Sequence, residues 1–441
     1  MRALSCDVLI VGAGIAGLTA FNELSRHGVH VLCVEARDRI GGRIFTIEDP
    51  YSPLPIELGP EFIHGLPPET WELVRPAKLA VYDCEERSVH IRDGKAVGHG
   101  DAWEQIDQIT DEMKRVAATG ADISFLEFIG GVRQPQSTKD LATSYVEGFN
   151  AAHNERISVA SLAQDAKASE TIDGDRTFRI ASGYKALPEF LLKTSAEGDS
   201  KLRLNTVVSS VDWTPSHAQV EARSTLTDAT FQIESRRVII TVPLGVLKAP
   251  KDEVGAIVFN PVPINITSAL ESLEFGNVTR LVFQFKDAWW QNHDRLSDTG
   301  FWLSDEKFFP TWWTTLPMRT PLLTGWSAGP HTDELLGQSK PVIVSRALGD
   351  LSRISKLKAT ELEEQLEAVH FHDWHADPFS RGAYSYVRAG AFRNRAALEL
   401  PVENTLFFAG EATELNGHGG TVHGARATGR RSARQVLESL R

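Results

Sequence analysis

The hydrophobic positions of this chain begin with two short apolar runs separated by a helical period. The first run, residues 8–11, has the length and β-branched content of a buried strand and stops at a glycine. Apolar residues then recur at helical spacing: Ile15, Leu18, Phe21 and Leu24. A second apolar run covers residues 29–34. The pattern predicts a strand, a helix and a second strand in that order.

Helical spacing dominates the next part of the chain, from residue 66 to about residue 180. One of its apolar stripes consists of Trp103, Ile106, Ile109, Met113 and Val116. The pattern then predicts a helix over 184–192, a strand over 202–211 and a buried strand over 238–243.

From residue 277 the hydrophobic period becomes two. Val278, Arg280 and Val282 would share one face of a strand, with Leu281 and Phe283 on the other. Further short strands are predicted at 301–302, 312–313 and 323–326, followed by a helix over 361–369. Six of the ten tryptophans lie between residues 289 and 326, which is enough aromatic surface to line a cavity.

The turn after the first strand carries three spaced glycines, Gly12, Gly14 and Gly17. With this spacing the first permits a tight turn, the second lets the backbone approach a pyrophosphate, and the third lets the helix pack close to the strand. The phosphates would face the N-terminus of the helix. Glu35 follows the second strand, 23 positions after Gly12, near the spacing at which an acidic residue meets a ribose hydroxyl. Because a carboxylate favours an unphosphorylated ribose, these residues predict FAD or NAD rather than NADP.

A second glycine turn follows at once, with guanidinium groups beside it: Arg37-x-Arg39-Ile40-Gly41-Gly42-Arg43. A planar guanidinium fork matches the geometry of a diphosphate. On these residues the sequence resembles flavoproteins with a two-dinucleotide-type domain, in which this segment clasps the FAD pyrophosphate. The resemblance implies FAD as the ligand and contacts from Ala36, Arg37, Gly42 and Arg43.

Composition and charge limit the class of protein. At 441 residues the chain is longer than one ordinary core requires, so we expect two domains. The formal net charge of −12 argues against nucleic-acid and membrane-surface partners, because both require a basic face. The three cysteines lack metal or disulfide spacing, which indicates a reducing compartment. No apolar run reaches the roughly 18 residues of a membrane span, so we expect a soluble, cytoplasmic protein.

The C-terminal part carries further motifs: Trp374-x-x-Asp377-Pro378-Phe379, then Phe407-Phe408-Ala409-Gly410-Glu411, then Gly420-Thr421-Val422-His423-Gly424-Ala425. Together with the N-terminal turns they resemble the flavin-containing amine oxidases, which include monoamine oxidases, polyamine oxidases and lysine-specific histone demethylases. The likeness runs from Asp7 to Leu437. It implies oxidation of a small-molecule amine, with FAD as cofactor and dioxygen as electron acceptor.

The resemblance also implies a fold. We expect an α/β protein with a Rossmann-like FAD-binding domain and an inserted α+β substrate domain, a mixed sheet flanked by helices. The FAD-binding domain would be discontinuous and comprise residues 1–82, 182–265 and 376–441. The substrate-binding domain would comprise residues 83–181 and 266–375.

Several further cofactor contacts are implied by the resemblance alone. They are expected at Ile15, Ala16, Gly59, Pro60, Glu61, Val208, Gly410, Glu411, Thr421, Val422 and Ala425. Val208 is equally compatible with a plain core position. A helix that begins after Thr421 would suit the negative charge of a reduced flavin.

Three positions depart from the family pattern. The cysteine that carries FAD in monoamine oxidases corresponds to Ala383, so attachment is expected to be noncovalent. Of the two tyrosines that hold the amine before the flavin, Tyr384 is present but the second is Thr421, which makes Trp374 a candidate wall. The lysine that holds a water against flavin N5 corresponds to Arg280. Arginine stays protonated and cannot shuttle a proton, so this residue does not imply rapid reaction with dioxygen.

Histidines are candidates for two further roles. In polyamine oxidases the residue aligned with His64 faces the substrate entrance, although a lone histidine among apolar neighbours is also compatible with a structural role. His370 and His372 would share a strand face, but no third ligand follows at metal spacing, so no metal site is predicted.

The catalytic residues are therefore expected to be Arg280, Tyr384, Thr421, His64 and Trp374. In the first hypothesis the deprotonated amine passes hydride from its α-carbon to flavin N5, the imine hydrolyses, and dioxygen becomes hydrogen peroxide. An alternative keeps the flavin but uses dioxygen poorly, as a dehydrogenase, a desaturase or an amino-acid oxidase would. A flavin-retaining scaffold without turnover is a third hypothesis.

Overall fold

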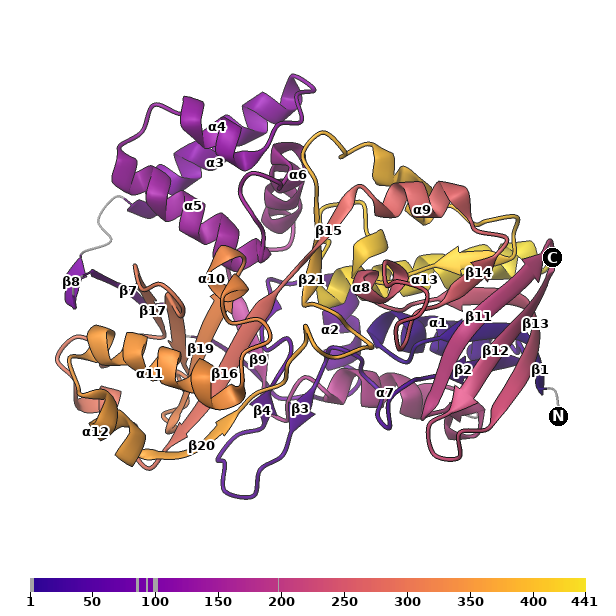
Figure 1. The fold of residues 1–441 in the computed structure, drawn as a ribbon, viewed down its shortest axis with the longest axis horizontal. Coiled ribbons are helices and arrows are strands. Elements are labelled where there is room, and N and C mark those ends of the chain that lie inside the picture. The colour runs from indigo at the N-terminus through magenta and orange to yellow at the C-terminus, as the bar shows by residue number, and fades with distance from the viewer. Residues whose placement is uncertain (1–3, 85–86, 93, 98–101, 197) are drawn as a thin grey trace.

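The computed structural model describes residues 4–84, 87–92, 94–97, 102–196 and 198–441. They form two lobes that lie side by side along the long axis of the molecule (Figure 1). The N-terminus and the C-terminus both lie on the same lobe. Each lobe is built on one large sheet. Among the described residues, no helix combines the length and apolar character needed to cross a membrane.

The lobe that contains the termini is built on an eight-stranded mixed sheet. Its strands in spatial order are β10 (Leu202–Arg203), β2 (Val31–Val34), β1 (Leu4–Val11), β13 (Thr230–Ile240), β12 (His217–Ser224), β11 (Thr206–Thr214) and β14 (Val258–Asn260), and β22 (Leu406–Phe408) also pairs with β13. β1 runs parallel to β2 and to β13, and β22 runs parallel to β13. This parallel centre confirms the predicted Rossmann-like fold.

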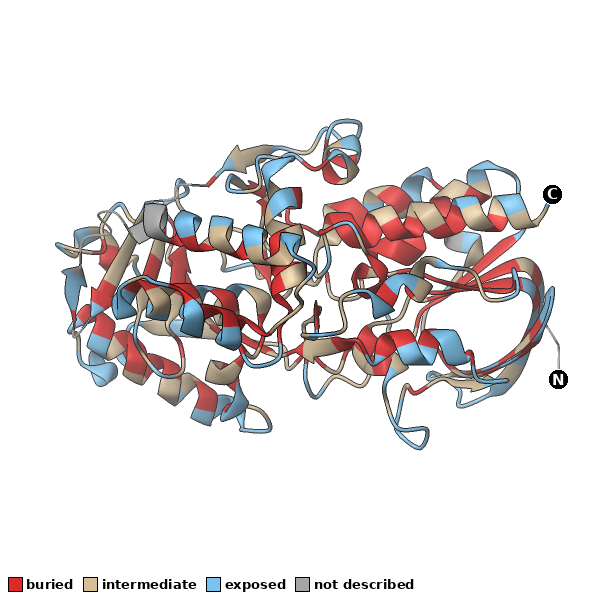
Figure 2. Cartoon of the chain, turned by 90° about the horizontal axis from the view of Figure 1, so that it is seen from above, coloured by how far each residue is buried: buried red, intermediate tan, exposed pale blue. Residues whose placement is uncertain are grey.

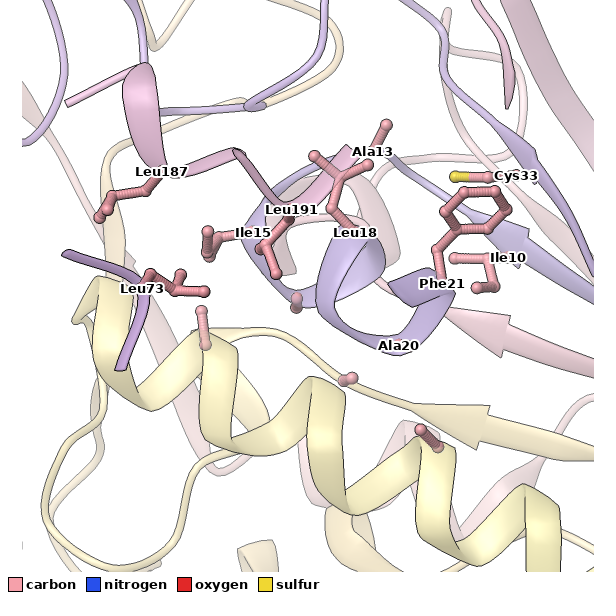
Figure 3. Packing of buried hydrophobic residues seen from close by; sticks show 14 of the residues in the cluster. Ile10, Ala13, Ile15, Leu18, Ala20, Phe21, Cys33, Leu73, Leu187 and Leu191 are labelled. Carbon is pink, nitrogen blue, oxygen red and sulfur yellow. The ribbon is translucent and has the colours of Figure 1, made fainter. Parts of the chain in front are cut away.

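Successive side chains of β1 enter two different cores, because they point to opposite faces of the sheet. Val8 and Ile10 pack on one face, and Leu9 and Val11 pack on the other. The first face is covered by α1 (Ile15–Arg26), α2 (Pro68–Val74), α7 (Ala186–Thr194) and α13 (Val422–Ser439). Figure 3 shows the apolar side chains of α1 in this core, beside α13. Burying one such aliphatic side chain stabilises the fold by about 1.5–3 kcal/mol.

The second lobe is built on a seven-stranded sheet. Its strands in spatial order are β20 (Leu366–His370), β16 (Val278–Phe285), β19 (Leu322–Ala328), β18 (Thr311–Thr314), β17 (Phe301–Ser304), β7 (Ser88–Arg92) and β8 (Lys95–Val97). One face packs on α11 (Lys340–Ser355) and α12 (Ala359–Glu364), with Leu281 and Phe283 of β16 in that core. Val282 packs on the opposite face, next to β4 (Ile56–Glu57). The predicted alternation along β16 is confirmed.

Four helices form a group of their own beside this second sheet: α3 (Ala102–Ala118), α4 (Phe125–Gly131), α5 (Gln136–Asn150) and α6 (Val159–Glu170). Ile109 and Met113 of the predicted stripe lie in their shared core, whereas the side chain of Trp103 is outside the described residues. In Figure 2 the buried residues of the helices face the interior of the protein and the exposed residues face outward.

Short elements connect the lobes. β3 (Thr46–Ile47) pairs with β4, β9 (Thr177–Ile180) pairs with β5 (Ile63–His64) and β6 (Val81–Asp83), and β15 (Leu273–Gly276) pairs with β21 (Tyr384–Val387). The remaining α-helices of the described chain are α8 (Leu244–Leu247), α9 (Ile264–Leu270) and α10 (Pro330–Asp333). Through these pairings, residues near positions 60, 180 and 384 come close to β16.

Three predicted elements differ in extent from the structure. The strand predicted over 202–211 is two strands, β10 and β11, because Asn205 adopts a φ of 53° and interrupts the extended backbone. The helix predicted over 361–369 ends at Glu364, and β20 follows because its residues pair with β16. The predicted helix over 184–192 begins two residues later, as α7.

Candidate functional site

The turn between β1 and α1 has a backbone that only glycines can form. Gly12 has a φ of 106°, in the region that favours glycine. A Cβ atom at Gly17 would lie 2.0 Å from the Gly12 carbonyl oxygen, so a side chain there would separate the helix from the strand. Gly14 precedes α1 without a side-chain cap, and the helix starts at Ile15 and Ala16. The turn therefore presents backbone N–H groups and a positive helix end to an anion.

Glu35 lies at the end of β2, directly beside this turn. Its Oε2 accepts a hydrogen bond from the amide of Ala13 at 2.8 Å, and its Oε1 accepts one from the amide of Arg37 at 3.0 Å. The side chain is buried, and Ala36 continues the backbone next to it. The structure thus brings the predicted ribose-binding carboxylate to the predicted phosphate-binding turn.

Two arginines of the second glycine turn have carboxylate partners in the protein. Arg37 donates two hydrogen bonds of 2.9 Å to Asp377. Arg43 donates to Glu411 at 2.8 Å and to the carbonyl oxygen of Ala383 at 2.7 Å. These contacts join the N-terminal segment to the C-terminal one. Both guanidinium groups were predicted to bind the diphosphate, and in the structure they also hold the two segments together.

The third arginine, Arg39, has one guanidinium nitrogen without a hydrogen-bond partner among the described residues. This atom, Nη2, is buried. Burial, followed by the charge of Arg37, lowers the pKa of the guanidinium to about 10. Gly41 next to it donates to the Ala13 carbonyl oxygen, and Gly42 has a φ of 60°. A buried, unpartnered guanidinium nitrogen beside two glycine turns fits a bound diphosphate. The sequence motif contains Arg39, but local sequence does not show which arginine lacks a protein partner.

Glu411 connects the C-terminal motifs to the second glycine turn. Its Oε2 accepts hydrogen bonds from the Ser385 hydroxyl at 2.6 Å and from the Gly420 amide at 3.1 Å, while its Oε1 pairs with Arg43. Gly410 before it has a φ of 127° and marks the turn after β22. One buried carboxylate therefore fixes β21, the end of β22 and the start of α13 relative to one another.

Thr421 caps α13, and Val422 is the first residue of the helix. The Thr421 hydroxyl accepts a hydrogen bond from the Gly424 amide at 3.0 Å and donates one to the His418 carbonyl oxygen at 2.7 Å. The hydroxyl proton and one acceptor lone pair are used within the cap, so the hydroxyl cannot donate to a substrate. Val422 and Ala425 pack against the core that contains α1, and Gly429 further along α13 lies against Ala16 at the start of α1.

Arg280 of β16 lies against the segment that follows β4. Its Nη1 donates to the Gly59 carbonyl oxygen at 2.7 Å, and its Nη2 pairs with the carboxylate of Glu61. A Cβ atom at Gly59 would lie 1.9 Å from the Arg43 carbonyl oxygen, so this segment packs directly on the second glycine turn. Pro60 connects the two residues that Arg280 contacts. Sequence spacing had identified Arg280, but not its carboxylate partner.

Glu61 is held between two buried guanidinium groups. Arg179 donates to its Oε1 at 2.6 Å, and Arg280 pairs with its Oε2, which also accepts the indole N–H of Trp313 at 2.9 Å. Burial favours the neutral acid, but the two arginines outweigh it, and the pKa of Glu61 lies below its usual value. The carboxylate is therefore ionised. Sequence analysis did not identify Arg179, which is 118 positions from Glu61 and carries no motif of its own.

A continuous aromatic surface leads from Arg280 to His64. The guanidinium lies 5.4 Å from the Trp313 ring centroid. Trp313 contacts Phe62 at 5.6 Å, Phe62 contacts His64 at 6.1 Å, and His64 contacts Phe149 of α5 at 5.7 Å between ring centroids. Arg280 and His64, both predicted site residues, thus lie along one surface. Its other members, Trp313, Phe62 and Phe149, come from three separate parts of the chain.

Tyr384 joins this surface through Phe149. Its hydroxyl donates to the Phe149 carbonyl oxygen at 2.8 Å, and burial raises its pKa. A Cβ atom at Gly420 would lie 3.4 Å from the Tyr384 ring, so the backbone just before Thr421 packs on Tyr384. Burial alone lowers the pKa of His64 to about 4, which keeps its imidazole neutral at ordinary pH.

Trp374 was predicted as a candidate wall of the site, and in the structure it lies on the segment that carries Leu58. Its ring lies 4.2 Å from that of His372 and 6.4 Å from that of Phe45, and its indole N–H donates to the Leu58 carbonyl oxygen at 2.8 Å. These contacts pack Trp374 against the segment that precedes Gly59. Its described ring neighbours do not include Tyr384.

The remaining candidates are one valine and two histidines. Val208 is buried in the core on the second face of the first sheet, which is compatible with either role considered for it. His370 contacts Gln284, and His372 shares Asp377 with Arg37. Within the described ranges no three histidine, cysteine or acidic side chains are grouped as a metal site would require.

Comparison with known proteins gives one family. The family model described as flavin containing amine oxidoreductase matches residues 15–437. Among curated relatives, lysine-specific histone demethylase 1 homolog 3 of Arabidopsis thaliana is 28% identical over 98% of this chain and 30% of its own length. Polyamine oxidase 3 of Oryza sativa subsp. japonica is 28% identical over 99% of this chain and 90% of its own length. The chain spans 58% of the second demethylase relative, homolog 2 of Arabidopsis thaliana.

Solved structures share the fold. Putrescine oxidase bound to putrescine superposes with a TM-score of 0.82 at 21% identity and covers 99% of this chain and 100% of its own. Cyclohexylamine oxidase from Brevibacterium oxydans IH-35A superposes with a TM-score of 0.81 at 19% identity over the same shares. The architecture predicted from the sequence is confirmed.

Proposed function

The chain belongs to the flavin-containing amine oxidoreductase family, and from this premise we propose that it oxidises a small-molecule amine and transfers the electrons to dioxygen, giving hydrogen peroxide. Its cofactor is FAD, and as a member of the family it is an oxidoreductase that acts on CH–NH groups. The proposal also assigns residues 1–82, 182–265 and 376–441 to FAD binding and residues 83–181 and 266–375 to substrate binding.

FAD, when bound, supplies an acceptor for hydride at its N5 atom. Glu35 is suited to the ribose hydroxyls, and the Gly12–Gly17 turn with Arg39 is suited to the diphosphate, because an unpartnered buried donor lies there. The N-terminus of α13 at Val422 supplies partial positive charge for the reduced state. Ala383 has no nucleophilic atom, so the association is noncovalent.

The aromatic surface prepares the amine for hydride transfer. An alkylammonium ion has a pKa near that of lysine, about 10.4, and must lose its proton before its α-carbon can release hydride. The Tyr384 ring attracts the cation by its π face. His64 stays neutral, and Phe62 and Phe149 exclude water, so the neutral amine is favoured once it is bound.

The observation that carries the proposal is the meeting of the two ends of the chain. Arg43 and Glu411 join the N-terminal glycine turns to β21 and to the start of α13, the elements that carry Tyr384 and Thr421, and this supports a site formed by both ends of the chain. Arg280 contacts the N-terminal part of the chain from the other lobe. These contacts support the proposal that the cofactor-binding and substrate-binding residues form one site.

In a rival function the protein binds the same cofactor, but its reduced form reacts slowly with dioxygen, as in a dehydrogenase or an amino-acid oxidase with poor dioxygen use. Arg280 is the observation that favours it, because a permanently charged guanidinium cannot relay a proton. Glu61 pairs with Arg179 as well as with Arg280, so this carboxylate offsets only part of the charge of Arg280. Amine oxidation with dioxygen remains the function best supported by the site.

The test is an anaerobic absorbance titration of the FAD-loaded protein with primary, secondary and polyamine substrates and with amino acids. The proposal expects loss of the oxidised flavin band with at least one amine, and return of the band with one equivalent of hydrogen peroxide when air is admitted. Bleaching without peroxide would establish the rival function. Absence of bleaching with every compound would leave only a flavin-retaining scaffold.

A further inference from the structure

A small cavity lies directly behind Arg280, between β4, β9 and β16. It has a volume of about 40 Å³, and its polar lining includes Glu57, Glu61, Arg179, Tyr82 and Arg280. A polar cavity needs about 10–15 Å³ of such volume for each water, so this one has room for about two or three. The site of proposed chemistry therefore has a polar chamber next to it.

Arg280 has one donor left for the contents of this chamber. Its Nη1 bonds the Gly59 carbonyl oxygen and its Nη2 bonds Glu61, whereas its Nε is buried without a partner among the described residues. Buried N–H groups of charged side chains are almost always satisfied, by water where protein atoms are missing. A water in the cavity would satisfy this donor.

The two carboxyl groups of the cavity, Glu57 and Glu61, differ in the charge of their hydrogen-bond partners. Glu61 is paired with two arginines and stays ionised. Glu57 is 8% exposed and accepts hydrogen bonds only from neutral groups, the amide of Tyr184 at 2.6 Å and the hydroxyl of Thr46 at 2.7 Å. Glu57 is therefore the carboxyl that can hold a proton.

The charges that face Glu57 come from several elements. Arg280 on β16 favours its ionised form, and Glu61 after β4 opposes it. Lys185 and the Tyr184 hydroxyl, both just before α7, also interact with its charge. Burial is the largest influence and raises the pKa of Glu57 to about 7, against the hydrogen bonds from Tyr184 and Thr46. The group is poised to exchange a proton near neutral pH.

Resting on the proposed function, we propose that Glu57 is the proton-exchanging residue of this site and acts through Arg280 by way of water held in the cavity. Conversion of dioxygen to hydrogen peroxide consumes two electrons and two protons. The hydride removed from the amine carbon brings both electrons and one proton. Glu57 gives the second proton, which the fixed charge of Arg280 cannot give, and its carboxylate is then reprotonated from solvent through the same water.

The test compares the FAD-loaded wild type with Glu57→Gln, which keeps the size of the side chain but cannot ionise. Both proteins are reduced with dithionite rather than with an amine, so the result does not depend on finding the substrate. Air-saturated buffer is then mixed in, and flavin reoxidation is followed between pH 5.5 and pH 9. The wild type is expected to slow as pH rises through about 7. The variant is expected to react at least about tenfold more slowly at pH 6 and to lose this pH dependence.

A second readout is the infrared absorption of protonated carboxyl groups in the same pH range. The wild type is expected to lose several such bands with midpoints near 7, since Glu57, Asp165 and Glu147 all have a pKa raised to about 7, and Glu57→Gln lacks one of these bands. Asp165→Asn is the matched control, because burial also raises the pKa of Asp165 to about 7 but its described neighbours Arg395, Glu414 and Ser161 do not line the cavity. It removes a different band and leaves the reoxidation profile of the wild type.

Two outcomes would overturn the proposal: a Glu57→Gln protein that reoxidises with the wild-type pH profile, or a Glu57→Gln protein that keeps every carboxyl band that titrates in the wild type between pH 6 and 8. If Glu57→Gln does not fold, Thr46→Val replaces it. Thr46 donates to the carboxylate of Glu57, so its loss is expected to move the reoxidation profile to higher pH, and an unmoved profile would contradict the proposal. Failure of every amine to bleach the flavin affects the proposed function but leaves these measurements interpretable.

Discussion

Replacing Glu61 with glutamine should destabilise the protein strongly, because it removes one charge that two buried cations share. The side chains of Arg179 and Arg280 are 6% and 5% exposed, and that of Glu61 is 10% exposed. Removing one partner of a buried ion pair typically costs about 3–5 kcal/mol, because the other charge stays buried and unpaired. Glutamine still offers one oxygen acceptor, but its amide N–H₂ faces a guanidinium donor. We expect a loss of about 3–5 kcal/mol in the free energy of unfolding at pH 7.

The assay is urea unfolding followed by tryptophan fluorescence, since Trp313 donates to Glu61 and reports on this part of the structure. The matched control is Glu48→Gln, which removes a carboxylate from an exposed ion pair with Lys185 and should leave stability unchanged within error.

The effect of Glu61→Gln should also depend on pH with a defined sign. The pKa of Glu61 in the folded protein lies below its unfolded value of about 4.3, so its ionisation stabilises the fold above that pH. The advantage of the wild type over the variant should be complete at pH 7 and shrink as the pH falls below about 4. Equal stability of the two proteins at pH 7, or a difference that is the same at pH 7 and in acid, would refute the buried ion network.

Three further substitutions test other parts of the site. Gly17→Ala should abolish retention of FAD, because the new Cβ atom would lie 2.0 Å from the Gly12 carbonyl oxygen. The control Gly130→Ala, whose Cβ atom would have no neighbour within 4 Å, should bind FAD as the wild type does. The ratio of flavin to protein absorbance measures FAD binding in both variants. Tyr384→Phe removes only the bond to the Phe149 carbonyl oxygen, so thermal unfolding should report a loss of about 0.5–1.5 kcal/mol and amine-dependent bleaching should persist. Asp377→Asn leaves Arg37 without its bidentate partner and should cost about 3 kcal/mol or more in urea unfolding; a neutral result would show that this pair does not hold the segments together.

The parts of the fold that depend on residues close together in the sequence could be predicted. The Gly12–Gly17 turn, β1, α1 and β2 follow from local spacing and from conformations that only glycine adopts. The alternation along β16 was also visible, because its two faces enter two different cores. Where a distant strand decides the conformation, the prediction was wrong, as at residues 366–370, which pair with β16 and extend the sheet instead of continuing a helix.

The site was predictable in its outline but not in its pairings. Family spacing identified Arg280, Tyr384 and His64, and the structure brings them to one aromatic surface. The ion pairs of Arg280 with Glu61 and of Arg37 with Asp377 join residues 219 and 340 positions apart, and no local pattern marks such pairs. The contact of Trp374 could not be predicted for the same reason, since its indole N–H bonds the carbonyl oxygen of a residue 316 positions away.

The central claim is that both ends of the chain hold one FAD noncovalently at the site where an amine is oxidised. Its most direct test is the absorption spectrum of the purified protein before and after acid precipitation, followed by amine addition without air. We expect one FAD per chain, full release of the flavin into the acid supernatant, and bleaching by an amine in the intact protein. A folded protein that is colourless and takes up no added FAD would contradict the account.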